Sequence, residues 1–116
     1  MNKKINVLYV VSSLRKCGPT NQLYEIIKYL DKDMFNVRIL TLFVEDKFSD
    51  IEKFKEAGIL VDSLNFKNTK NYFKIAYNLK RSLKNIPIDI IHSCGLAADF
   101  SSCFLRNSIH VSTIRN

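Results

Sequence analysis

Two short polar segments, residues 12–21 and 92–95, carry the side chains best suited to binding a ligand. In the first, Gly18 lets a ligand approach the backbone, and Pro19 suits the first position of a helix because its missing N–H is not needed there. The unpaired N–H groups and the dipole of such a helix start attract phosphate or carboxylate. In the second segment, His92 and Cys94 are titratable groups that form hydrogen bonds. Together the two segments predict a site for an anionic ligand.

The same residues also have a purely structural interpretation. Gly-Pro punctuates many loops, His92 could be a satisfied histidine at a strand end, and Cys94 could be a small filler. His110 lies far along the chain from the other candidates and is expected to be structural, while Cys103 is expected to be inert inside a buried helix. Two separated histidines without clustered acids predict no metal site. The glycine motifs of dinucleotide-binding and P-loop proteins are absent from the sequence.

Strands and helices that must position these segments alternate along the chain. The apolar run at residues 7–11 is typical of a strand buried on both faces, and apolar residues spaced i, i+3, i+4, i+7 from residue 23 to 30 predict a helix. Further strands are predicted at residues 37–44, 59–64, 88–92 and 109–114, with helices before Gly58, at 72–85 and at 96–105. This alternation predicts an α/β fold, a Rossmann-like doubly wound parallel five-stranded sheet of order 3-2-1-4-5 with helices on both faces. The two polar segments then meet at the switch point between the first and fourth strands.

Length and composition fit a single globular domain over residues 1–116, because 47% of the residues are hydrophobic and 25% are charged. No segment is apolar over the length of a bilayer, and the N-terminus has no signal-peptide pattern, so a cytoplasmic location is expected. The three cysteines are an odd number without metal-ligand spacing, which predicts reduced thiols and no structural zinc.

The net charge of +7 is concentrated in one region, since no acidic residue falls between Asp62 and Asp89. One face of the helix predicted from residue 72 is apolar, and the other carries Lys74, Tyr77, Arg81 and Lys84. This second face is either a solvated surface with snorkelling lysines or a contact with an anionic membrane surface. Nucleic acid is not expected as a partner, because no recognised RNA or DNA motif accompanies the charge.

Four stretches, in order, resemble the amino-terminal domain of the retaining family 4 glycosyltransferases of GT-B fold: LYVVSSL, GPTNQLYEIIKYL, PIDIIHSCG followed by LAADF, and VSTIRN. The resemblance runs from about Ile5 to Asn116 and covers half of such an enzyme. It implies two Rossmann-like halves facing a cleft, the first holding a carbohydrate or lipid-linked acceptor and the second a nucleotide-diphosphate sugar, with no other cofactor. The missing carboxy-terminal domain would stabilise the departing diphosphate, so this chain alone is expected to be inactive.

The resemblance also assigns residues to the two sides of the cleft. It implies that the donor diphosphate lies beside Cys17, Gly18, Pro19 and Thr20. It implies that the sugar or acceptor lies beside Asn21, His92, Ser93, Cys94, Gly95 and Arg115. Many relatives have histidine where this chain has Cys94 and Arg115, and cysteine is the weaker hydrogen-bond donor. No catalytic residue is assigned.

The implied function is assembly of surface polysaccharide or glycolipid, in the cytoplasm or at the inner face of the membrane. A non-catalytic binding module of flavodoxin-like or receiver-like type is the alternative. A receiver would carry an acidic pair where Ser12 and Ser13 stand, and a flavodoxin would need a phosphate loop with flanking aromatic residues, which the first turn provides only in part.

Overall fold

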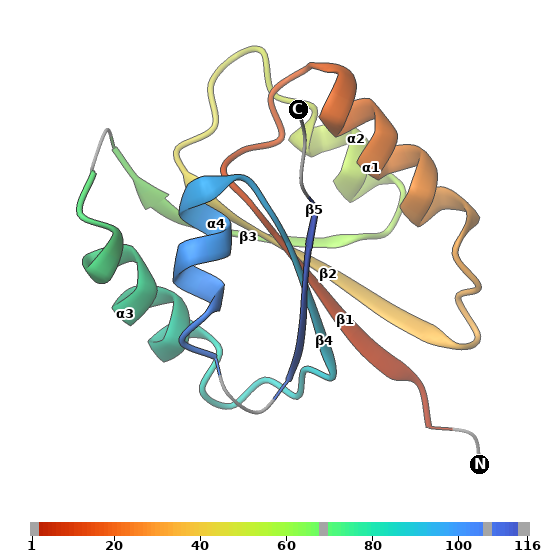
Figure 1. The fold of residues 1–116 in the computed structure, drawn as a ribbon. Helices are drawn as coiled ribbons and strands as arrows, with labels where there is room; N and C mark the ends of the chain where they lie inside the picture. The colour runs from red at the N-terminus through yellow and green to blue at the C-terminus, as the bar shows by residue number, and fades with distance from the viewer. Residues whose placement is uncertain (1–2, 68–69, 106–107, 114–116) are drawn as a thin grey trace.

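Strands and helices alternate throughout the computed structural model, which describes residues 3–67, 70–105 and 108–113 (Figure 1). The strands are β1 (Ile5–Val11), β2 (Phe35–Phe43), β3 (Leu60–Phe66), β4 (Ile90–Cys94) and β5 (Ile109–Thr113). The helices are α1 (Gly18–Tyr29), α2 (Ile51–Glu56), α3 (Tyr72–Ser82) and α4 (Leu96–Ser102). The succession of elements predicted from the sequence is confirmed.

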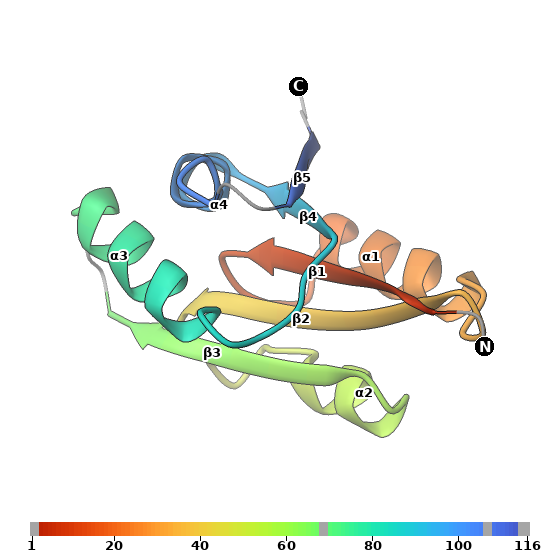
Figure 2. The same ribbon diagram turned by 90° about the horizontal axis from the view of Figure 1, so that it is seen from below.

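The strands form one sheet of order β3-β2-β1-β4-β5, in which all neighbours run parallel (Figure 2). This confirms the predicted order and the reversal of winding between β1 and β4. In the register of that central pair, Val11 lies opposite Cys94 at the carboxyl ends of both strands. The turns that follow the two strands therefore leave the sheet at the same edge.

Helices cover both faces of the sheet, as predicted, because β1 buries alternate side chains in two separate cores. Leu8 and Val10 pack in one core with buried residues of α3 and α4, whereas Val7, Tyr9 and Val11 pack in the other with buried residues of α1 and α2. Figure 1 shows α3 and α4 together at the left and α1 and α2 at the upper right. A strand segment buried on both faces is apolar at successive positions, which explains the apolar run from Val7 to Val11 in β1.

The fourth helix is shorter and less enclosed than the sequence suggests. It ends at Ser102, and only one side is buried, through small residues such as Ala97 and Ala98, while Leu96 is 73% exposed. Cys103 follows the helix and is exposed, so the expectation of a buried cysteine is wrong. The physical reason is that α4 packs only on the sheet and on α3, which leaves its outer side in solvent.

Across the described ranges, every helix is too short or too polar to cross a lipid bilayer.

Candidate functional site

The loop between β1 and α1 is held against the segment that follows β2. The Phe43 N–H donates to Ser12 O at 3.0 Å, and the Leu14 N–H donates to Glu45 Oε1 at 2.8 Å. The Asp50 N–H donates to Leu14 O at 2.7 Å, and the Leu14 side chain is fully buried. Because backbone and side chain are both anchored, this loop presents a preformed surface in front of α1.

The side chains of Cys17 and Thr20 form hydrogen bonds at the start of helix α1. The Thr20 hydroxyl donates to Arg15 O at 2.6 Å, and since it has a single proton, the Cys17 thiol is the donor in the 3.2 Å contact with Thr20 Oγ1. Cys17 is the N-cap, and the first backbone bond of the helix runs from Asn21 N to Cys17 O at 3.0 Å. The N–H groups of Gly18 and Thr20 therefore precede the helical ladder, at the positive end of the helix dipole.

The turn between β4 and α4 lies beside the first loop. Gly95 is the N-cap of α4 and has a φ of +100°, a left-handed conformation that favours glycine. A Cβ atom added at Gly95 would lie 3.8 Å from the Ser12 hydroxyl oxygen. Together with the pairing of Val11 and Cys94, this contact confirms the prediction that the two polar segments meet at one edge of the sheet.

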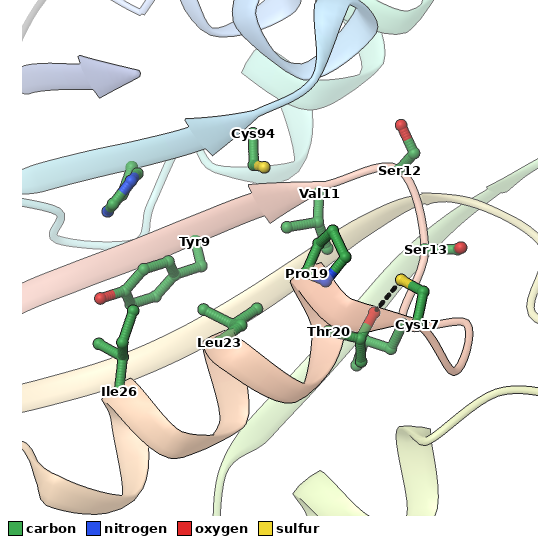
Figure 3. Close-up of a pocket in the computed structure, with 12 residues that line it drawn as sticks. Tyr9, Val11, Ser12, Ser13, Cys17, Pro19, Thr20, Leu23, Ile26 and Cys94 are labelled. Carbon is green, nitrogen blue, oxygen red and sulfur yellow. Dashed lines mark hydrogen bonds between the residues drawn. The ribbon is translucent and has the colours of Figure 1, made fainter. Parts of the chain in front are cut away.

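A cavity of about 190 Å³ lies where α1 faces the carboxyl ends of β1 and β4. Figure 3 shows Leu23 and Ile26 of α1 directed towards Tyr9 and Val11 of β1, with Cys94 at the end of β4. The apolar wall consists of Tyr9, Val11, Leu14, Pro19, Leu23 and Ile26. Polar groups come from Ser12, Ser13, Cys17, Thr20, His92 and Cys94. The cavity lining thus combines apolar surface with groups that can form hydrogen bonds.

Burial favours the uncharged forms of two titratable rings in the cavity, those of His92 and Tyr9. His92 is half-buried, and its ring centroid lies 5.0 Å from that of Tyr9. Burial lowers the pKa of the His92 imidazole below its usual value; His110 lowers it further, while the Asp99 carboxylate opposes both effects. Burial also raises the pKa of the Tyr9 phenol. A neutral imidazole can both donate and accept a hydrogen bond.

The structure brings some of the predicted site residues together and separates others. Five of them line the cavity: Cys17, Pro19, Thr20, His92 and Cys94. Gly18, Asn21 and Gly95 adjoin it in the chain without lining it, and Arg115 lies outside the described residues. Ser93 does not face the cavity, which corrects the expectation that residues 92–94 act on one side. Successive residues of a strand point to opposite faces, and Ser93 is buried on the α4 side.

Sequence reasoning missed the apolar wall and two polar residues on the α4 side. Tyr9, Leu23 and Ile26 were identified only as core residues, although strand alternation could have placed Tyr9 on the same face as Val11. Asp99 was not singled out, and His110, expected to be isolated, lies 2.7 Å from the Ser93 hydroxyl. The residues predicted for a membrane surface are exposed and do not line the cavity: Lys74, Tyr77 and Arg81 on α3, and Lys84 just after its end. Within residues 3–67, 70–105 and 108–113, no three His, Cys, Asp or Glu side chains gather as a metal site would require.

Comparison with known proteins finds two similar glycosyltransferases but does not assign the chain to a protein family. No protein-family model matches the chain. Two proteins from Escherichia coli, both named O-antigen biosynthesis glycosyltransferase WclY, are each 35% identical to it over 95 residues. The match covers 82% of this chain but 22% of each relative, so the chain spans about a fifth of the length of the curated relatives it matches. The sequence similarity therefore relates this chain to a glycosyltransferase over one segment of that protein.

Proposed function

We propose that this chain is the acceptor-side Rossmann-like domain of a nucleotide-sugar-dependent glycosyltransferase of the retaining family 4 type, with the GT-B fold. Its role would be the assembly of bacterial surface polysaccharide or glycolipid. The observation that carries the proposal is the 35% identity, over 82% of the chain, to a protein named for O-antigen biosynthesis. The cavity at the topological switch point supports it, because ligands of doubly wound sheets bind there.

In this proposal the donor diphosphate binds at the start of α1. The N–H groups of Gly18 and Thr20 point out of the helix end, and the exposed cations of Arg15 and Lys16 lie just before it in the chain. The sugar or acceptor occupies the cavity mouth, where neutral His92 exchanges hydrogen bonds with a hydroxyl group. Cys94 lies beside it and contributes shape rather than charge.

Catalysis in this proposal requires more than the residues of this chain. Among the described residues, those that line the cavity include no lysine, arginine, aspartate or glutamate. Stabilisation of charge that develops on the leaving diphosphate is usually the largest catalytic contribution. The remainder of a longer protein would supply it, so the chain by itself should bind ligand without turnover.

Alkylation of the three cysteines tests the proposed site on the chain as it stands. Cys17 lies at the start of α1 and Cys94 in the cavity, whereas exposed Cys103 lies at the end of α4 and serves as the internal control. Iodoacetamide labelling followed by peptide mass spectrometry would be run with and without uridine, guanosine and thymidine diphosphate sugars. A donor should slow labelling of Cys17 and Cys94 several-fold and leave Cys103 unchanged. Unchanged labelling of all three thiols with every donor would contradict the proposed site, and protection by FMN alone would favour a flavin-binding module.

We also propose that the outer surface of α3 and α4 attaches the protein to an anionic membrane, where a lipid-linked acceptor would be reached. Phe73 and Tyr77 of α3 are 69% and 65% exposed. The Phe73 ring contacts Phe100 at a centroid distance of 5.3 Å, and Phe100 contacts Phe104 at 5.4 Å. Exposed aromatic rings next to basic side chains suit the membrane interface, where each lysine or arginine contributes about 1 kcal/mol with anionic lipid. The basic side chains here are Lys74, Lys80, Arg81 and Lys84.

Liposome sedimentation tests this attachment. Vesicles containing phosphatidylserine should sediment the chain, and neutral phosphatidylcholine vesicles should not. The triple variant with Lys74→Glu, Arg81→Glu and Lys84→Glu should lose binding. A matched variant carrying Lys28→Glu, Lys32→Glu and Lys55→Glu, exposed residues on and near α1 and α2, makes the same change in net charge and should keep most of it. Equal loss in both variants would show that net charge alone attracts the protein, which would refute a defined surface.

A further inference from the structure

Three polar side chains from three different elements form a hydrogen-bonded triad on the α4 side of the sheet. The Ser93 hydroxyl oxygen of β4 lies 2.5 Å from Asp99 Oδ1 of α4 and 2.7 Å from His110 Nε2 of β5. Ser93 is fully buried. In the strand register, His110 pairs with Ile91 and Ser112 pairs with Ser93, which puts His110 and Ser93 on the same face. The polar triad, Asp99, Ser93 and His110, thus links β4, β5 and α4.

Proton counting fixes the direction of both hydrogen bonds. An ionised carboxylate only accepts, so the single proton of the Ser93 hydroxyl points to Asp99. The Ser93 oxygen must then accept from His110, which requires a proton on Nε2 of that ring. Because Ser93 is inaccessible to solvent, breaking either bond would leave a buried polar group without that partner, which is unfavourable.

The triad adjoins the cavity through the backbone of β4. Ser93 lies between His92 and Cys94, which both line the cavity from the opposite face of the strand. Asp99 also donates its backbone N–H to Gly95 O at 2.8 Å, the first hydrogen bond of α4. The β4–α4 turn is therefore connected to the triad at both ends, through Ser93 before the turn and through Asp99 after it.

We propose that Asp99, Ser93 and His110 are positioning residues of the cavity: they hold β5 and the start of α4 against β4, so that the turn containing Cys94 and Gly95 keeps its place. The apolar side chains Ile109 and Val111 of β5 are 67% and 44% exposed and give the strand little apolar anchorage, so the polar contacts of His110 are suited to this role. The triad thus links an edge strand to the geometry of the cavity mouth.

The Asp99 carboxylate also interacts electrostatically with His92, which lies on the opposite face of the sheet, and so affects its pKa. It favours the protonated imidazole, whereas burial and His110 disfavour it. The Tyr9 ring of β1 lies against the His92 ring, and Cys94 of β4, Cys17 before α1, and the uncharged Leu23 and Ile26 of α1 line the same cavity. Removing the Asp99 charge should therefore lower the pKa of His92, a change that a purely steric role of Asp99 would not produce.

Histidine NMR tests the triad directly, because the chain has only two histidines. A long-range ¹H–¹⁵N spectrum of the unmodified chain at neutral pH should show His110 with its proton on Nε2, and His110→Gln assigns the remaining signal to His92. Asp99→Asn, which can still accept from Ser93, should shift the His92 titration to lower pH. The matched variant Asp62→Asn, an exposed carboxylate on β3, should leave it in place.

Ser93→Ala provides an independent measurement of the turn. It should leave the His92 titration nearly unchanged, because Asp99 keeps its charge, but it should raise the alkylation rate of Cys94 several-fold relative to Cys17. A proton on Nδ1 of His110 in the unmodified chain would overturn the proposal, as would an unchanged His92 titration in Asp99→Asn. The first two measurements need no Ser93 variant, so they decide the matter even if Ser93→Ala fails to fold. All of them use the chain without ligand and are independent of the proposed transferase activity.

Discussion

Two buried threonines, Thr20 and Thr41, form a matched pair for testing how the first loop is held. The Thr20 hydroxyl donates to Arg15 O at 2.6 Å and accepts from the Cys17 thiol, whereas the Thr41 hydroxyl has no hydrogen-bond partner among the described residues. Thr20 is 5% exposed and Thr41 is fully buried. Valine keeps the branched shape of threonine and exchanges the hydroxyl for a methyl group. The same substitution is therefore expected to have opposite effects at the two positions.

The size of each effect follows from its hydrogen bonds. Thr20→Val removes both hydrogen bonds of this hydroxyl, to Arg15 O and from the Cys17 thiol, and leaves the carbonyl of exposed Arg15 to solvent, so the free energy of unfolding should fall by about 1–2 kcal/mol. A buried hydroxyl without a partner costs about 1–3 kcal/mol, and so Thr41→Val should raise the free energy of unfolding by about 1 kcal/mol or more. For a domain of this size, 1 kcal/mol moves Tm by roughly 3–6 °C, so the two variants, separated by about 2–3 kcal/mol, should melt about 6–18 °C apart.

Thermal and urea unfolding followed by circular dichroism would measure both variants beside the unmodified chain. Equal m values would show that only stability has changed. If Thr20→Val were as stable as the unmodified chain, the Thr20 hydroxyl could not be what holds Arg15 and the start of α1. If Thr41→Val were destabilised by as much as Thr20→Val, the Thr41 hydroxyl would have a partner after all, and the hydrogen-bond assignment of the sheet would be refuted.

Three further predictions concern the core, the second turn and pH. Leu79→Ala should cost about 2–5 kcal/mol in urea unfolding because Leu79 is fully buried, whereas Leu60→Ala, at a position 60% exposed, should cost less than about 1 kcal/mol. Gly95→Ala should lower the free energy of unfolding by about 1–3 kcal/mol because of the φ of +100°, while Gly18→Ala, with no atom within 4 Å of the added Cβ, should be nearly neutral in the same assay. Burial lowers the pKa of the His92 imidazole below 6.5, so as the pH falls the unfolded chain binds a proton at His92 before the folded chain does. The free energy of unfolding should therefore decrease as the pH falls below about 6.5. Urea unfolding between about pH 8 and pH 5 should show this decrease, and the His92→Gln variant should lose the part of it that is due to His92. If the free energy of unfolding depended on pH equally in the variant and the unmodified chain, the lowered pKa of His92 would be contradicted.

The β1–α1 unit shows which features of the structure local sequence patterns predict correctly. An unbroken apolar run, followed by a turn containing Gly18 and Pro19 and then an amphipathic stripe, allows one local arrangement, and the structure has it. The polar segment ending at Gly95 followed from the same logic, since glycine at the end of an apolar run marks a turn. Even the meeting of the two segments followed from general rules of winding, because right-handed crossovers leave few topologies for five parallel strands.

The fourth helix and the last strand show where such patterns failed. Leucine and cysteine are residue types that are usually buried, which is why Leu96 and Cys103 were misjudged. Burial also depends on what packs against each side of a helix, and α4 packs only against α3 and the sheet. Ser93 and His110 are 17 positions apart, and their contact depends on the register of β4 and β5. No local propensity encodes that register.

The amino-acid sequence by itself determined the order and kind of the elements, the parallel sheet and the edge at which the two polar turns emerge, because hydrophobic periodicity and chain handedness act locally and generally. Only the tertiary structure decided which side chains share the cavity, that Tyr9 and Ile26 form its wall, and that Asp99, Ser93 and His110 meet behind it. Such contacts arise from strand register and from the face on which each helix packs. Both are properties of the whole fold, set by the competition of many weak interactions for the same buried space.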